Sequence, residues 1–371
     1  MSVSHQNLFA EFPPISKADW LNKIEKDLKG RPLSELDWQL HPLSIAAFLH
    51  AEDFTEMPEP ILDNRSANSW LVGEDIEVTD FKAANKQVLA ALMAGVNAPR
   101  FVFNDYATKE QLSVLLADIE LDFIVTCFQE KTENCSPLAF LKNVKEIAGA
   151  KAFDIKGTIH YDPFADGRYD VKTVTDEISW ASENLPNFTV ITVNAERYRQ
   201  NTEGVVLELA NALSAGEKYL KKLTANGLSA DMIQKSMAFR FQVGDAYFVE
   251  IAKLRAFKLL WGNVLSAYNI APSTPRLLVY TEGVTPDENP HTHKIKATTQ
   301  AMSAVMAGVE TLTVSPSENS VFGRRIARNV QHLLYMESYL DRVADPSAGS
   351  YYIERLTEQL AQAAWEVFQK Q

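Results

Sequence analysis

The strongest constraint on the fold is the regular alternation of short apolar runs with longer helical patterns. Eight runs have the apolar, β-branched and aromatic character of buried strands: Arg100–Phe103, Phe123–Phe128, Ile155–His160, Thr189–Val193, Phe239–Val243, Leu277–Tyr280, Thr311–Val314 and a weak one at Val343 and Ala344. Helical patterns separate them or close the chain, at residues 108–119, 137–149, 173–184, 204–223, 245–268, 291–308, 318–340 and 353–369. Because strand–helix–strand crossovers are right-handed, this order predicts one parallel sheet covered by helices.

Eight such units predict an α/β fold, a (β/α)8 TIM-type barrel. A doubly wound open sheet is the alternative, but it usually has a glycine-rich turn after its first strand. The corresponding residues here, Phe103-Asn104-Asp105-Tyr106, contain no glycine. A length of 371 residues leaves room for one large barrel or two ordinary domains, so the alternation decides the question in favour of the barrel.

The N-terminal part of the chain has a different character. A predicted helix begins near Ser16 and ends before Gly30, and a polar, proline-bearing stretch over residues 52–68 follows the arm. The sequence therefore predicts an N-terminal helical arm and linker, residues 1–68, and a barrel domain, residues 69–371.

Charge and cysteine content exclude several kinds of partner. The formal net charge of -12 repels phosphate backbones and anionic membranes, so we expect neither a nucleic-acid nor a membrane partner. The longest nearly apolar stretch, Val88–Ala98, is too short to cross a bilayer. Cys127 and Cys135 form neither a disulfide framework nor a Cys-x-x-Cys motif, and the N-terminus has no signal-peptide pattern. We therefore expect a cytoplasmic protein.

Reacting groups of a barrel lie at the carboxyl ends of its strands. Twelve polar residues occupy those positions: Asn104, Asp105, His160, Tyr161, Asp162, Asn194, Glu196, Arg197, Tyr198, Arg199, Thr281 and Glu282. His160 is a candidate general base, because a carboxylate such as Asp162 moves the pKa of a histidine into the working range. The simpler interpretation, which we favour, is a helix-capping aspartate beside a packed histidine.

Three other patterns have ordinary structural explanations. His291 and His293 open a predicted helix without a third ligand, which favours a solvated helix start over a metal site. Three arginines share one helical face, where they either hold an anion or, more ordinarily, form a solvated or subunit-facing stripe: Arg324, Arg325 and Arg328. Helical spacing predicts four core residues on another helix: Phe248, Ile251, Leu254 and Leu259.

Five sequence motifs between the arm and the last helix are distinctive: Asp27–Gly30, Gly157–Ile159, Phe248–Ala256, Arg325–Asn329 and Asp345–Glu354. Together they resemble the methylmalonyl-CoA mutase family. The resemblance implies a (β/α)8 barrel whose active members pass acyl-CoA along the barrel axis. It also implies adenosylcobalamin, held between the barrel and a separate cobalamin-binding domain, and a radical rearrangement in an enclosed cavity.

The residues that would carry this chemistry differ here. Where active members have their catalytic histidine, after Tyr198, this chain has Arg199. The family's active-site tyrosine lies in an arginine-proline-tryptophan context that residues 66–80 lack, and the family's histidine-serine-glutamine-threonine stretch is replaced by Thr281–Val284. A glutamine of the family pattern is His160. We therefore predict that the chain has no catalytic and no cofactor-binding residues.

Cobalamin binding in the family uses an Asp-x-His-x-x-Gly loop, and none of the seven histidines has an aspartate two places before it. We also expect the C-terminal cobalamin-binding-like domain to be absent from this chain. A chain that keeps the barrel pattern but lacks the family's catalytic residues resembles the small subunits of heterodimeric bacterial mutases. The resemblance implies a non-catalytic small subunit of adenosylcobalamin-dependent methylmalonyl-CoA mutase. Its partner would be the large catalytic subunit, which interconverts methylmalonyl-CoA and succinyl-CoA in propionate metabolism.

Two alternatives remain open. An active cobalamin-dependent acyl-CoA mutase with a rearranged site would use Arg199 and His160 to polarise the thioester, although a guanidinium cannot act as a neutral donor. A stand-alone barrel enzyme or small-molecule binder would use His160 and Asp162. An open, ligand-sized cavity at the carboxyl ends of the strands would favour this second alternative.

A subunit that binds no substrate is free to fill its barrel axis. We expect large side chains there, with five candidates: Phe101, Phe103, Phe123, Phe239 and Phe241. We expect the arm to lie on the large subunit, because its own barrel cannot wholly bury its apolar residues: Trp20, Leu21, Leu28, Trp38 and Phe48.

Overall fold

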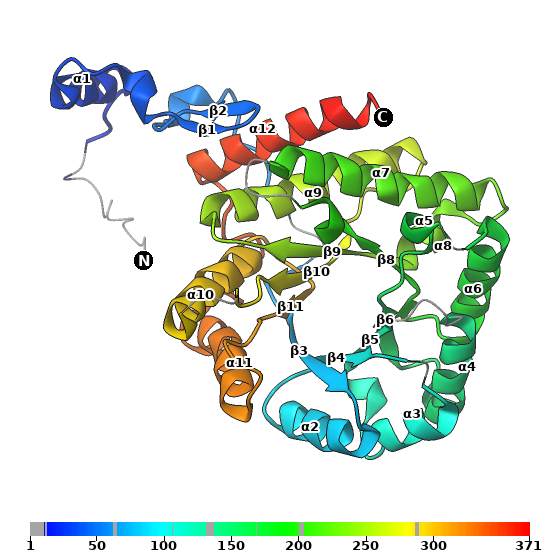
Figure 1. Ribbon diagram of the computed structural model, residues 1–371. Coiled ribbons are helices and arrows are strands. Elements are labelled where there is room, and N and C mark those ends of the chain that lie inside the picture. The colour runs from blue at the N-terminus through cyan, green and yellow to red at the C-terminus, as the bar shows by residue number, and fades with distance from the viewer. Residues whose placement is uncertain are drawn as a thin grey trace, which may run out of the picture.

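The computed structural model describes residues 11, 13–61, 65–105, 107–130, 137–167, 169–199, 204–285 and 289–371. Its centre is a parallel sheet that curls into a barrel (Figure 1). The strands of this sheet are β3 (Leu71–Val78), β4 (Ala98–Phe103), β5 (Val125–Glu130), β6 (Lys156–Ile159), β7 (Phe188–Thr189), β8 (Ile191–Asn194), β9 (Met237–Val243), β10 (Arg276–Thr281) and β11 (Thr311–Thr313). Their order is β7-β6-β5-β4-β3-β11-β10-β9-β8.

The barrel closes through β7 and β8, which together form one strand of the barrel, or stave, interrupted at Val190. β7 pairs with β6 and β8 pairs with β9, both in parallel. At the junction, the Val190 amide donates to the Ser236 carbonyl at 3.0 Å. Counting β7 and β8 as one stave gives eight, so the predicted (β/α)8 barrel is confirmed.

Helices surround the sheet (Figure 1). They are α2 (Phe81–Met93), α3 (Lys109–Leu115), α4 (Pro137–Ala148), α5 (Pro163–Asp166), α6 (Val171–Asn184), α7 (Val205–Thr224), α8 (Ala230–Lys235), α9 (Tyr247–Ala267), α10 (Pro290–Met306), α11 (Val321–Met336) and α12 (Tyr351–Phe368). Short 3₁₀ turns are η3 (Leu121–Phe123), η4 (Gly149–Lys151) and η5 (Ala195–Tyr198). Over the described residues, no helix is both long enough and apolar enough to cross a membrane.

The last predicted strand was wrong, and the first strand of the barrel was missed. Val343 and Ala344 lie in the turns between α11 and α12, and the missing stave is β3. Its sequence, with acids such as Glu74 and Asp75, does not look like a buried strand. Both acids are neutralised by arginines from distant segments, Arg328 and Arg100 respectively, and periodicity within one segment cannot reveal such partners.

The phenylalanines predicted to fill the axis do not do so. Phe101 packs against Phe128 at 5.6 Å between ring centroids, and Phe239 packs against Trp261 of α9 at 4.8 Å. Phe103 and Phe241 likewise contact helix residues outside the sheet, and Phe123 is 80% exposed in η3. Successive side chains of a strand point to opposite faces, so Arg100, next to Phe101, and Arg240, next to Phe239 and Phe241, point inward instead.

Helix α9 is buried on nearly all sides, charged residues included. Ile251 and Leu254 are core residues as predicted, whereas Phe248 is 50% exposed and Leu259 is 44% exposed, so those two predictions were wrong. Four charged residues of α9 are buried: Glu250, Lys253, Arg255 and Lys258. Because buried charges need partners, these residues determine which elements α9 can contact.

Arg255 joins two of the family-like stretches. Its guanidinium pairs with Asp345 and forms two bonds of 2.9 Å to the carboxylate of Glu354 on α12. Asp345 also accepts from the Ile61 amide at 3.0 Å, and Glu354 accepts from the Gly349 amide at 3.0 Å. The sequences of these two stretches therefore specify a buried ion cluster that links α9 to α12 and to the linker.

The arm forms α1 (Lys17–Leu28), η1 (Leu33–Leu36), a hairpin of β1 (Trp38–Leu40) and β2 (Leu43–Ile45), and η2 (Ala51–Asp53). Ser16 caps α1 as predicted, accepting from the Asp19 amide at 3.1 Å. In Figure 1, α1 stands away from the barrel and the hairpin lies beside α12. Arg355 of α12 donates to the Asp53 carbonyl at 2.6 Å, so the end of the arm is tied to the barrel domain.

Candidate functional site

The barrel axis contains a cluster of polar side chains, which we call the axial cluster: Asp75, Arg100, Gln129, Arg240 and Tyr280, from β3, β4, β5, β9 and β10. The guanidinium carbons of Arg100 and Arg240 lie 4.3 and 4.8 Å from the centroid of the Tyr280 ring. Both arginines donate to the amide oxygen of Gln129. These contacts join strands that are not neighbours in the sheet, so the axial cluster crosses the barrel interior.

The axial cluster is balanced in charge. Arg100 forms a two-bond fork with the carboxylate of Asp75, one of them 2.8 Å long. Arg240 pairs with Glu196 of η5 at 2.7 Å. Cys127, opposite Arg100 on β5, is a buried free thiol whose pKa burial raises to about 12. It is therefore uncharged at neutral pH, and the two arginine charges are met by two carboxylates.

His160 follows β6 and faces this cluster. Its Nε2 lies 3.4 Å from the Tyr280 hydroxyl oxygen, and its buried Nδ1 has no hydrogen-bond partner among the described residues. Burial, followed by the charges of Arg100 and Arg240, holds the pKa of His160 well below its ordinary value. The expected carboxylate would raise that pKa, so the environment is the opposite of the one that a general base beside an aspartate requires.

Asp162 engages other partners. Its carboxylate accepts from the Tyr219 hydroxyl of α7 at 2.6 Å and from the Asn194 amide at 2.9 Å. It precedes α5, but its side chain forms no capping bond to that helix. The favoured interpretation was thus wrong about the cap, because the carboxylate instead ties the end of β6 to β8 and α7.

Arg199 ends η5, at the carboxyl end of β8. Its side chain is 13% exposed and pairs with Glu250 at 3.1 Å and with Glu282, which follows β10, at 2.6 Å. Of the other rim residues, Asn104 and Asp105 are exposed, and Thr281 accepts from the Ser315 amide at 2.8 Å. The structure therefore brings Arg199 and Glu282 together. The third member is the buried Glu250, which the sequence analysis placed only within a helix.

The remaining candidate patterns are dispersed. His291 is exposed, whereas His293 is buried with its Nε2 3.2 Å from the Ser315 carbonyl oxygen. No group of three or more potential metal ligands occurs within the part of the chain that the structure describes. Arg328 pairs with the buried Glu74, and the nearest Arg324 nitrogen is 3.9 Å from the same carboxylate. These two arginines therefore face the barrel and do not form a solvated stripe.

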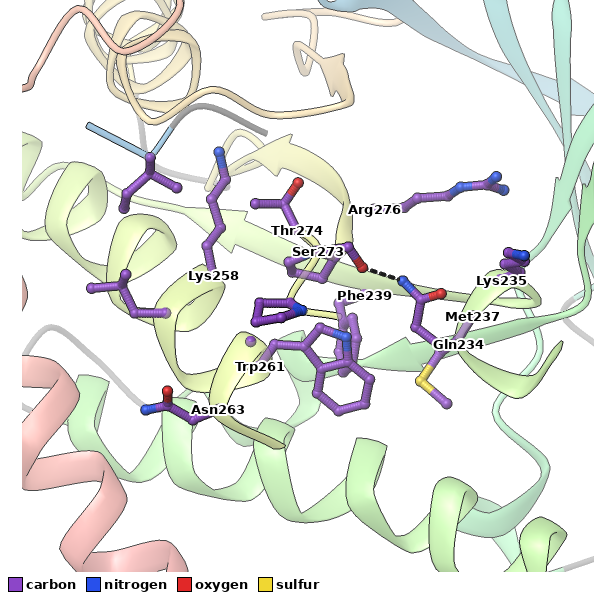
Figure 2. Close-up of a pocket in the computed structure, with 15 residues that line it drawn as sticks. Gln234, Lys235, Met237, Phe239, Lys258, Trp261, Asn263, Ser273, Thr274 and Arg276 are labelled. Carbon is purple, nitrogen blue, oxygen red and sulfur yellow. Dashed lines mark hydrogen bonds between the residues drawn. The ribbon is translucent and has the colours of Figure 1, made fainter. Parts of the chain in front are cut away.

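A cleft of about 590 Å³ opens beside α8 and α9, near the amino ends of β9 and β10 (Figure 2). Trp261 and Phe239 form part of its wall, and Gln234 donates to the Ser273 hydroxyl at 2.6 Å across it. The Lys258 ammonium is bound by the Ala307 and Gly308 carbonyls at 2.9 and 2.7 Å. This cleft lies at the opposite end of the strands from the positions where a barrel carries its reacting groups.

Sequence reasoning missed Glu177, a carboxyl on α6 that is only 1% exposed. Burial raises its pKa to about 7, while the Tyr161 hydroxyl and the Leu138 amide lower it by less. The signal was present: Glu177 lies three residues after Val174 and one before Ile178, both fully buried, so helical spacing places it on the inward face.

Replacing Glu177 with glutamine should stabilise the protein at alkaline pH. The pKa of this carboxyl is raised on folding from its ordinary value of 4.5, so its ionisation costs stability as pH rises from about 5 through 7. Between pH 5 and pH 8 the stability gained by the variant should grow to about 3 kcal/mol. Urea unfolding at both pH values measures this, and an equal difference at pH 5 and pH 8 would contradict it.

Known proteins resemble this chain over most of its length. The sequence model of the methylmalonyl-CoA mutase family matches residues 106–371. The methylmalonyl-CoA mutase small subunit of Porphyromonas gingivalis is 34% identical over 399 residues, covering 99% of this chain and 64% of that protein. The small subunit of Streptomyces virginiae is 28% identical, covering 98% and 64%, and the methylmalonyl-CoA mutase of Escherichia coli is 28% identical, covering 71% and 40%.

Among solved structures, the dihydropteroate synthase of Vibrio fischeri matches with a TM-score of 0.42 and 13% identity over 72% of this chain and 94% of that one. A TM-score this low does not support an assignment. The sequence relatives support one, although the chain spans only 64% of the length of the small subunits it matches. On the family match and the 34% identity, the chain belongs to the methylmalonyl-CoA mutase family.

Proposed function

We propose that this chain is the barrel part of the non-catalytic small subunit of a heterodimeric, adenosylcobalamin-dependent methylmalonyl-CoA mutase. The large subunit would interconvert methylmalonyl-CoA and succinyl-CoA in propionate metabolism, and this chain would stabilise it. The relatives named small subunits support the pairing with a large one. The net charge of -12 and the buried free thiol of Cys127 support a cytoplasmic complex.

The observation that carries this proposal is the axial cluster. An acyl-CoA that passed along the axis would meet two guanidinium groups stacked on one tyrosine ring and already paired with carboxylates. Displacing Asp75 from Arg100, whose side chain is 8% exposed, would leave a buried guanidinium without its partner, which is unfavourable. The axis is thus filled by stable polar contacts, and we infer that it holds no substrate.

Neither His160 nor His293 fits the role of lower cobalt ligand. His160 is enclosed by the axial cluster, and His293 is buried against the Ser315 carbonyl. None of the seven histidines of the sequence follows an aspartate at the spacing of the cobalamin loop. Adenosylcobalamin would therefore be bound by the large subunit.

The two alternatives lack support from the contacts. Arg199, which an active but rearranged mutase would need, is held by two carboxylates. His160 and Asp162, which a stand-alone enzyme would need, bind different partners. The large cleft near the strands' amino ends is not at the position that this second alternative requires.

The purified chain should show no turnover of methylmalonyl-CoA with adenosylcobalamin, and Arg199→His should not restore it. An imidazole at this position would still face a filled axis and would remove the guanidinium that pairs with Glu250 and Glu282. Succinyl-CoA formation above the level of a protein-free control, in either protein, would contradict the proposed role.

A further inference from the structure

Arg199 connects the loops that follow three consecutive staves. It lies at the end of η5, after β8, and its Nη1 donates to the Gln242 carbonyl at the end of β9 at 2.8 Å. The same nitrogen donates to Glu250, in the first turn of α9, at 3.1 Å. Its Nη2 donates to Glu282, after β10, at 2.6 Å. One guanidinium therefore spans the carboxyl rim of the barrel from β8 to β10.

Each carboxylate partner of Arg199 is itself fixed. Glu250 accepts from the Gly244 amide at 2.9 Å and pairs with Lys253 at 2.6 Å. The backbone amide of Glu282 donates to Gln300 of α10 at 3.0 Å, and the side-chain amide of Gln300 donates to the Glu282 carboxylate at 3.4 Å. Both carboxylates therefore have a second partner besides Arg199.

The close approach of the backbone supports the same assignment. A Cβ atom on Gly244 would lie 2.2 Å from Nη2 of Arg199 and 2.9 Å from a Glu282 oxygen. A side chain at this position would push the guanidinium out of its site. Burial by itself lowers the pKa of Arg199, but the carboxylates of Glu250, Glu208 and Glu282 together raise it, so the group stays charged.

We propose that Arg199 is a strap that holds the loops after β8, β9 and β10 in one closed arrangement without any ligand. Its planar guanidinium directs N–H donors of fixed geometry from two nitrogens to three partners, and a lysine ammonium does not reproduce that geometry. It is a positioning residue, and its role here concerns the rim of this chain alone. This role does not depend on whether the chain pairs with a large subunit.

Hydrogen exchange of backbone amides tests the strap in the full chain. In Arg199→Ala and in Gly244→Ala, exchange should accelerate about tenfold or more in residues 195–199, 244–250 and 281–285 together, because charge-assisted bonds that resist local opening are lost. Amides of β4 should keep their wild-type rates. Adding guanidinium at millimolar concentration should slow exchange again in the alanine variant of Arg199 but not in that of Gly244.

The matched control is Lys235→Ala, which removes an exposed ion pair with Asp231 and should leave the three segments unchanged. If Arg199→Ala does not fold, Gly244→Ala and Glu282→Gln test the same contacts with the arginine retained. The strap is contradicted if only one of the three segments accelerates, or if all regions, β4 included, accelerate equally. It is also contradicted if Gly244→Ala exchanges like the wild type.

Discussion

Replacing Arg255 with alanine should lower the free energy of unfolding by about 3–5 kcal/mol, the usual cost of leaving a buried charge without its partner. The side chain is 2% exposed, and its partners Asp345 and Glu354 are 5% and 2% exposed. The substitution would leave two carboxylates in the interior and would loosen α12 from α9. Urea unfolding monitored by tryptophan fluorescence measures the loss.

Two further variants make this prediction specific. Lys235→Ala, at an exposed pair, should cost less than about 1 kcal/mol. Adding Glu354→Gln to Arg255→Ala should recover part of the loss, because it removes one of the stranded charges. A loss below about 1 kcal/mol for Arg255→Ala would show that the ion cluster does not hold α12 in place.

Deleting residues 1–30 should weaken binding to the large subunit at least about a hundredfold while the barrel still folds. Within α1 only Leu28 is buried, and Trp20 packs against Phe48 of the arm itself at 5.5 Å. A twelve-residue helix is marginal alone in water, so α1 needs a covering surface. Burying two large apolar side chains on the partner contributes about 3 kcal/mol or more, which is a hundredfold in affinity.

Titration calorimetry with the large subunit of the source organism measures this affinity. The matched control is Met93→Ala, because Met93 is 90% exposed at the end of α2 and far along the chain from the arm. The control should bind like the wild type. Equal affinity of the deletion variant and the intact chain would mean that α1 lies elsewhere in the complex.

The sequence was sufficient to predict the barrel because most staves and helices bury one continuous apolar side. It failed where charge is neutralised across the fold. β3 was missed because its acids pair with Arg100 and Arg328 from other segments. The axis was assigned to phenylalanines because large apolar side chains are the usual filling of a closed interior. Arg100 and Arg240 face the interior instead, where Tyr280 and carboxylates accept them.

The candidate site was predicted in position but not in its contacts. Arg199 was correctly placed at a strand's carboxyl end, and its partner Glu282 was among the rim residues. Glu250, however, is one of many charged residues on a helix, and nothing local shows that it is buried. The partners of His160 and Asp162 could not be predicted either, because three-dimensional proximity to Tyr280 and Tyr219 depends on barrel closure.

The most direct test of the central claim is the rate of succinyl-CoA formation when this chain is titrated into a fixed amount of the large subunit with adenosylcobalamin. We predict no turnover by this chain alone at any concentration, and turnover that rises with added chain until the two are equimolar and then stays constant. Turnover that continues to increase in proportion to this chain, or that occurs without the large subunit, would contradict the account.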